Sequence, residues 1–251
     1  MVGSGVRVRV LQEGVSFVPE SKWDLNRSII GSGELELNLP IQPVSLQANR
    51  RKKDAITFAV RNITKHYEFI LTDDVQVDIE WWIHTQDRYE LDSSADVDNI
   101  IKPLLDALCG PDGILFDDCQ VQSVQCGWLD HTIDTQNVVL RVKNLDRNAW
   151  LLKEGLIFVH MWKGLCYPLL FHGYEPKITL KIIEQMEFML SSRDEMLERT
   201  GSYHHARMLM SCQRIFHISR VQDFPILQLS EVKSGLQHMI NQQSSVQASV
   251  E

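Results

Sequence analysis

The chain has 251 residues, of which 44% are hydrophobic, and its formal net charge at pH 7 is −8. This length suits one large domain or two small ones, with enough apolar residues for a sizeable buried core. The five cysteines are odd in number and have no paired short spacings. Their pattern argues against a disulfide framework and predicts a reducing, cytoplasmic location.

Residues 1–10 lack a continuous apolar stretch, so we expect no secretory signal there. The most apolar segment, residues 150–171, is interrupted by charged side chains and a histidine. We therefore expect a buried helix or strand in it rather than a membrane span. The negative net charge gives a nucleic-acid partner no support. It does not exclude one either, because an enzyme that holds divalent metal ions concentrates carboxylates.

Residues 1–33 show no strong periodicity, and we expect an N-terminal extension with one strand and irregular structure. The elements that follow alternate between strand and helix periodicity. They are a strand at 34–39, a helix at 53–68, a strand at 75–84, a helix at about 99–109, and two strands at 120–128 and 137–142. This β-α-β-α-β-β order predicts a mixed α/β (α+β) domain over residues 34–145.

One proline limits where the second of these helices can start. Pro103 is tolerable only if the helix begins at Asp98 or Asn99, because a proline is accepted in or just beyond the first turn.

Beyond residue 145 the pattern becomes that of helices. A long helix is expected from residues 175–176 to just before Gly201, and two more at 203–219 and 229–242. We expect a helical extension over residues 146–242, which is either a separate domain or a set of helices packed on the first one. The polar tail at 243–251 is expected to be disordered.

The segment that carries chemistry reads Asp96-Val-Asp-Asn-Ile-Ile-Lys102. Asp96 and Asp98 lie at a loop-to-helix junction with one residue between them, so both carboxylates can point the same way. Lys102 follows Asp98 by one helical turn. A further pair, Asp117 and Asp118, directly precedes a strand. Carboxylates brought together repel one another unless a cation lies among them, and oxygen ligands of this kind suit Mg²⁺ or Mn²⁺.

By spacing alone, helix capping and a turn explain these aspartates somewhat better than a metal site does. The string Asp-Asp-x-Gln-Val at 117–121 also occurs upstream at 73–77. We expect the upstream copy to mark a turn that enters a strand.

Three linked elements together give a more specific pattern. Asp-x-Asp-Asn-x-x-Lys, Asp-Ala-Leu and Asp-Asp-x-Gln-Val follow one another over residues 96–121, and they resemble the signature of the RusA family of Holliday junction resolvases. The resemblance covers about residues 34–144. It implies a small mixed α/β homodimer that cuts four-way DNA junctions with symmetric nicks. By motif position, it implies that Asp96, Asp98 and Asp118 bind the metal, that Lys102 is the functional lysine, and that Asp117 is an additional candidate ligand.

The resemblance thus predicts a Mg²⁺-dependent, structure-selective endonuclease of DNA recombination and repair, with Mn²⁺ as an alternative metal. The basic run Arg50, Arg51, Lys52 and Lys53 would then grip the DNA backbone, although a solvated helix face explains such a run equally well. One alternative is a non-catalytic junction-binding protein on the same fold, which would gain nothing from clustered carboxylates beside DNA. The other is a Mg²⁺ nuclease for other branched DNA.

Overall fold

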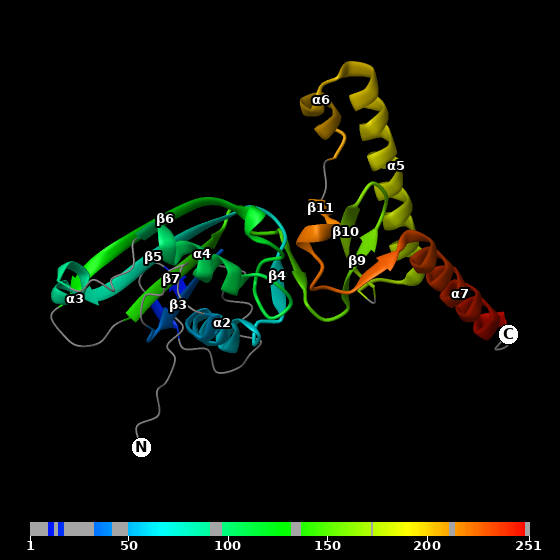
Figure 1. The fold of residues 1–251 in the computed structure, drawn as a ribbon. Coiled ribbons are helices and arrows are strands. Elements are labelled where there is room, and N and C mark those ends of the chain that lie inside the picture. The colour runs from blue at the N-terminus through cyan, green and yellow to red at the C-terminus, as the bar shows by residue number, and fades with distance from the viewer. Residues whose placement is uncertain are drawn as a thin grey trace. The chain divides into compact units, whose positions relative to one another are not determined.

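The computed structural model describes residues 10–12, 15–17, 33–41, 50–90, 97–131, 137–171, 173–210 and 214–248. The chain divides into two compact units, residues 1–151 and 152–251, just beyond the boundary expected near residue 145 (Figure 1). Each unit has its own hydrophobic core. Both units combine helices and strands, which confirms the mixed α+β class.

The first unit is built on a four-stranded sheet of order β3-β7-β5-β6. Its elements in chain order are β1 (Val10–Gln12), β2 (Val15–Phe17), β3 (Glu34–Leu39), α2 (Arg50–Thr64), β4 (Phe69–Leu71), β5 (Val75–His84), α3 (Thr85–Tyr89), α4 (Val97–Leu108), η1 (Asp118–Gln120), β6 (Val121–His131), β7 (Asn137–Asn144) and β8 (Trp150–Leu152). The predicted β-α-β-α-β-β order is confirmed as β3, α2, β5, α4, β6 and β7. Two short pairs, β1-β2 and β4-β8, add to it.

Strand direction explains why α4 lies where it does. β3 pairs antiparallel with β7, and β7 with β5, whereas β5 and β6 run parallel. Parallel neighbours need a crossover connection, and the segment with α3 and α4 supplies it. The crossover returns the chain to the edge of the sheet where β5 begins, so η1 and the start of β6 lie beside the start of β5.

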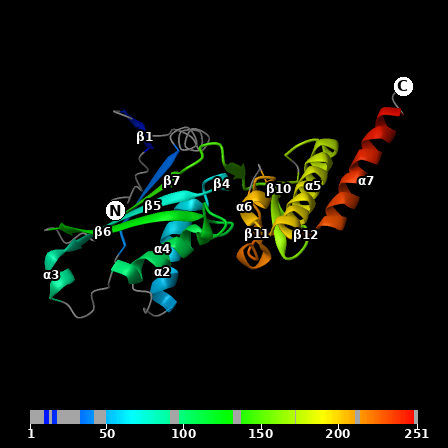
Figure 2. The same cartoon turned by 90° about the horizontal axis from the view of Figure 1, so that it is seen from above.

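Helices α2 and α4 cover one face of this sheet (Figure 2). Along β5, buried and half-buried residues alternate strictly, as expected for a strand with one covered face. The buried set packs with Ile56 and Val60 of α2 and with Ile100 and Leu104 of α4. This packing fixes the position of the α4 backbone above the sheet.

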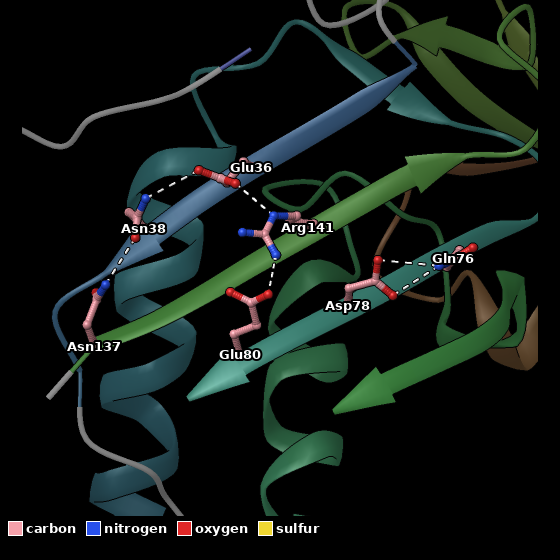
Figure 3. A network of polar contacts seen from close by, with 7 residues as sticks. All are labelled: Glu36, Asn38, Gln76, Asp78, Glu80, Asn137 and Arg141. Atoms are coloured by element: carbon pink, nitrogen blue, oxygen red, sulfur yellow. Dashed lines mark hydrogen bonds and ion pairs between the residues drawn. The ribbon is translucent and has the colours of Figure 1, made fainter. Parts of the chain in front are cut away.

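The other face of the sheet carries a polar network (Figure 3). Arg141 of β7 binds Glu36 of β3 at 2.7 Å and Glu80 of β5 at 2.6 Å. Gln76 donates to Asp78 on the same strand at 3.0 Å. Two carboxylates therefore share one guanidinium, and a third, that of Asp78, accepts from an amide, so this network is acidic.

Helix α4 starts earlier than expected, and it runs through its proline. Pro103 lies in the helix interior and is buried, so the expectation that it falls in or just beyond the first turn is wrong. A proline has no N–H to donate, so the helix lacks the hydrogen bond to the carbonyl of residue 99. Burial of this apolar ring offsets part of that loss.

The second unit is a four-stranded sheet of order β11-β10-β9-β12 with helices. Its elements are β9 (Leu156–His160), β10 (Leu165–Leu170), α5 (Pro176–Thr200), α6 (Tyr203–Arg207), β11 (Phe216–His217), η2 (Ile218–Arg220), β12 (Ile226–Gln228) and α7 (Leu229–Ala248). The apolar segment at 150–171 thus forms β8, β9 and β10. Among the described helices, none combines the length and apolarity needed to cross a membrane.

Two expectations for this region are wrong. The helix expected at 203–219 ends at Arg207, and Phe216 instead pairs with Cys166 of β10 and packs edge-on against Phe158. Burial of that ring outweighs local helix preference, so the extension is not helical alone. The tail expected to be disordered from residue 243 continues α7 to Ala248. There, Ser244 and Ser245 donate to carbonyls one turn earlier in the helix.

Candidate active site

The structure brings together part of the predicted site. Lys102 lies midway along α4, and Asp118 begins η1, directly before β6. Asp96 lies outside the described residues. Asp98 is in the first turn of α4, and its side chain also lies outside them. The basic residues Arg50, Arg51, Lys52 and Lys53 begin α2, and the described part of the chain does not include their side chains.

Lys102 and Asp118 are in direct contact. The Lys102 ammonium forms a short ion pair with Asp118 Oδ2 and lies 2.8 Å from Asp106 Oδ1. The hydrogen bond to Asp106 raises the pKa of Lys102 most, and the hydrogen bond to Asp118 raises it further, so the side chain is an ammonium at neutral pH. All three side chains are 30–54% exposed. Ion pairs this exposed contribute about 0–1 kcal/mol each to stability, so stability alone gives little reason for the arrangement.

Asp106 is the residue that sequence reasoning missed. It belongs to the Asp-Ala-Leu element of the signature, but no role was assigned to it. Its spacing from Lys102 is i, i+4 on one helix, which is the signal that could have shown the contact. With Asp118 on the other side, it places the lysine between two carboxylates.

The two neighbouring aspartates do different things. Asp117 is the N-cap of η1, and its Oδ1 accepts from the backbone N–H of Cys119 at 3.0 Å. The side chain of Gln120 completes a capping box by accepting from the N-cap backbone. Asp118 instead faces α4 and meets Lys102. This geometry favours Asp118 over Asp117 as the ligand.

Helix α2 holds the turn that links α4 to η1. Arg61 Nη2 donates to the carbonyl of Cys109 at 3.0 Å, and Thr64 Oγ1 donates to that of Asp112 at 2.7 Å. Within the turn, the backbone N–H groups of Ile114 and Leu115 both donate to the last carbonyl of α4, that of Leu108. These hydrogen bonds restrain both ends of the turn between α4 and η1, and they thereby fix where Asp117 and Asp118 lie.

The upstream copy of the string marks a turn, as expected. Asp73 Oδ1 accepts from the backbone N–H of Asp74 at 2.8 Å, and β5 starts at the next residue. Because β5 and β6 are parallel and Val75 pairs with Val121, the two copies lead into neighbouring strands at the same edge of the sheet.

The carboxylate donors that the structure describes near Lys102 suit a hard metal ion. Among the described side chains, which do not include those of Asp96 and Asp98, no three acidic, histidine or cysteine groups form a metal cluster. The described donors, Asp118 and Asp106, are oxygens gathered around a cationic group. Asp98 precedes Lys102 by four residues in the sequence of α4, which is about one helical turn. Carboxylate oxygens are the ligands of Mg²⁺ and Mn²⁺.

A comparison with protein families decides the relationship. Residues 45–143 match the family model described as Endodeoxyribonuclease RusA. This part of the chain, which is less than half of its length, is similar to the RusA family. The match falls within the first unit, and it includes α4, Lys102 and Asp118. No curated protein matches the sequence. The contact between Lys102 and Asp118 thus lies within the RusA-like region, while residues 152–251 lie outside the match.

Proposed function

We propose that the protein is a Mg²⁺-dependent, structure-selective endonuclease that resolves Holliday junctions by symmetric nicking in DNA recombination and repair. The observation that carries this proposal is the ammonium of Lys102 placed between Asp106 and Asp118 within the RusA-like region. Partly exposed carboxylates grouped around a lysine are suited to a phosphate substrate and a metal, and they contribute little to stability.

Each side chain has a distinct task in this proposal. Asp118 would hold Mg²⁺ together with Asp96 and Asp98, and Mn²⁺ would serve as well. When bound, the metal lowers the pKa of a coordinated water and neutralises charge on the scissile phosphate. Lys102 would bind a phosphate oxygen or stabilise the departing oxygen. Asp106 would keep that ammonium oriented while the Asp118 carboxylate is engaged.

The charges of the first unit favour one side for DNA. The face of the sheet opposite the helices carries Glu36 and Glu80, which share Arg141, and also Asp78, which accepts from Gln76 (Figure 3). Phosphates are repelled there, so DNA would approach from the side of α2 and α4. The basic first turn of α2, Arg50–Lys53, would contact the backbone. Such contacts are blind to sequence and fit recognition of junction shape.

Symmetric nicking requires two active sites related by a two-fold axis. We therefore propose a homodimer, the simplest assembly with that symmetry. The four cysteines that the structure describes are free thiols, which agrees with the proposed reducing, cytoplasmic compartment.

The test is cleavage of a synthetic mobile four-way junction, with linear duplex and flap DNA as controls, in Mg²⁺ or EDTA. Asp118→Asn should keep junction binding and lose about 100-fold or more in nicking rate, the effect typical of losing one group that stabilises a transition state. Asp74→Asn is the matched control, because Asp74 holds the same place in the upstream string. It should cleave like the wild type.

Three outcomes contradict the proposal. Tight junction binding by the wild type without nicking, in both Mg²⁺ and Mn²⁺, would indicate a junction-binding protein. Faster cleavage of flaps than of junctions would indicate another branched-DNA nuclease. Equal nicking by Asp118→Asn and Asp74→Asn would remove Asp118 from the active site.

A further inference from the structure

Gln120 is a buried polar side chain beside the site, with 1% of its surface exposed. Its Oε1 accepts from the backbone N–H of Phe116 at 2.7 Å and from that of Asp117 at 3.3 Å. Its Nε2 donates to the carbonyls of Leu71 at 2.9 Å and Asp73 at 3.1 Å. Both polar atoms of the Gln120 amide are thus hydrogen-bonded, and their partners come from two segments that are far apart in sequence.

These contacts fasten the turn that carries Asp118 to the loop that leads into β5. On one side of the amide are the residues directly before Asp118, and on the other is the loop between β4 and β5. A buried polar group that loses its partner costs about 1–3 kcal/mol, so movement of either segment is opposed. These hydrogen bonds therefore restrain the backbone directly before Asp118, while the Asp118 carboxylate forms an ion pair with Lys102.

The upstream copy of the string shows that this arrangement is not general to Asp-Asp-x-Gln-Val. Gln76 occupies the same place in that copy, is half-buried, and donates to the side chain of Asp78 on its own strand. The same Asp-Asp-x-Gln-Val pattern thus adopts two different sets of contacts. Only the copy that reaches Lys102 has its glutamine in the core.

We infer that Gln120 is a positioning residue that holds Asp118 in the geometry needed for metal binding. The inference rests on the proposed function, because it assigns Asp118 to the metal. Groups behind a metal ligand typically change metal affinity by about 10–100-fold when they are removed. Gln120 touches neither metal nor DNA in this assignment, and it acts only through the turn.

The experiment compares Gln120→Met with the control Gln76→Met in the full-length protein. Methionine keeps the length of the side chain and removes both hydrogen-bonding atoms. Mn²⁺ affinity is measured by calorimetry, junction binding in EDTA by gel shift, and folding by thermal unfolding. Gln120→Met should bind Mn²⁺ about ten-fold more weakly or worse and bind the junction like the wild type. Gln76→Met should match the wild type in both.

A double-mutant cycle separates positioning from general destabilisation. In an Asp118→Asn background, Gln120→Met should weaken Mn²⁺ binding no further, although its cost in thermal stability persists. If Gln120→Met lacks a cooperative unfolding transition, Gln120→Glu takes its place, since it keeps the acceptor toward Phe116 and Asp117.

The outcomes distinguish this inference from the proposed function. Wild-type Mn²⁺ affinity in the Gln120 variant, or an equal loss with and without Asp118, overturns the inference and leaves the nuclease proposal standing. A wild-type protein that binds no Mn²⁺ and nicks no junction overturns both.

Discussion

At the scale of single residues, neighbouring side chains of the same type have separate roles. Asp117 and Asp118 are adjacent aspartates, yet one caps a short 3₁₀ turn and the other forms an ion pair with Lys102. The difference arises because successive residues of a turn point in different directions, and Gln120 fixes which one points toward α4. A one-residue shift of the turn would exchange these roles.

The glycine at position 113 gives a prediction at this scale. A Cβ added at Gly113 would lie 2.0 Å from the carbonyl oxygen of Leu108, at the end of α4. The contacted oxygen belongs to the backbone, so it cannot move aside as a flexible side chain would. Gly113→Ala should therefore lower the free energy of unfolding by about 3 kcal/mol, the upper end of typical overpacking. Urea unfolding at pH 7 measures it.

The matched control is Gly127→Ala in β6. A Cβ at Gly127 meets no heavy atom within 4 Å, so stability should stay within about 0.5 kcal/mol of the wild type. Equal effects of the two substitutions would mean that the turn before η1 can shift freely. That result would also contradict the fixed placement of Asp118.

At the scale of elements, one carboxylate joins a hairpin to a helix in the second unit. Between β9 and β10, a turn closed by the Leu165 N–H and the Trp162 carbonyl at 2.9 Å has positive φ at both central residues, Lys163 at 53° and Gly164 at 76°. Lys163 is a poor residue for that conformation. Asp194 of α5 binds it at 2.8 Å, accepts from the Trp162 ring nitrogen at 3.2 Å, and pairs with Arg193 at 2.6 Å.

These contacts make the stability of the second unit depend on pH. Burial on its own raises the pKa of Asp194, but hydrogen bonds from Lys163, Arg193 and Trp162 outweigh it and lower the pKa to about 2. The unfolded value is about 3.9, so between these values the unfolded state binds more protons, and stability is lost as the pH falls. Asp194→Asn should cost about 1–2 kcal/mol at pH 6, and this difference should shrink below pH 4 and nearly vanish at pH 2.

Urea unfolding of both proteins between pH 2 and pH 6 measures the effect. Glu195→Gln is the control, because Glu195 is exposed and has an ion pair with Arg199 at 3.4 Å one turn away. It should change stability by only a few tenths of a kcal/mol, the size of an exposed helix pair. A pH-independent cost of Asp194→Asn would mean that its carboxylate is not stabilised by these donors.

Particular elements show which structure could be predicted from sequence. Strand β5 was predictable because its alternation reflects one covered face, and α4 because its apolar residues recur at helical spacing. The contact of Lys102 with Asp118 was predictable only through the family signature, since it depends on a crossover that periodicity does not show. The strand at Phe216 was not predictable locally, because it forms only by pairing with β10.

At the scale of the whole molecule, charge and core are divided along the chain. Residues 152–251 contain ten Lys or Arg and ten Asp or Glu, so the whole net charge of −8 belongs to residues 1–151. The main core cluster of the first unit and that of the second unit share no residue. A chain with two such cores need not unfold in one step.

This division gives the last prediction. Urea unfolding of the full chain should resolve two transitions, one for each core. Gly113→Ala should lower the midpoint of one transition and Asp194→Asn that of the other, because the two residues lie in different units. Near-ultraviolet circular dichroism and tryptophan fluorescence can follow both transitions, since each unit contains tryptophan. A single transition that both substitutions shift would instead show that the two cores unfold cooperatively, and the second unit would then contribute directly to the stability of the nuclease domain.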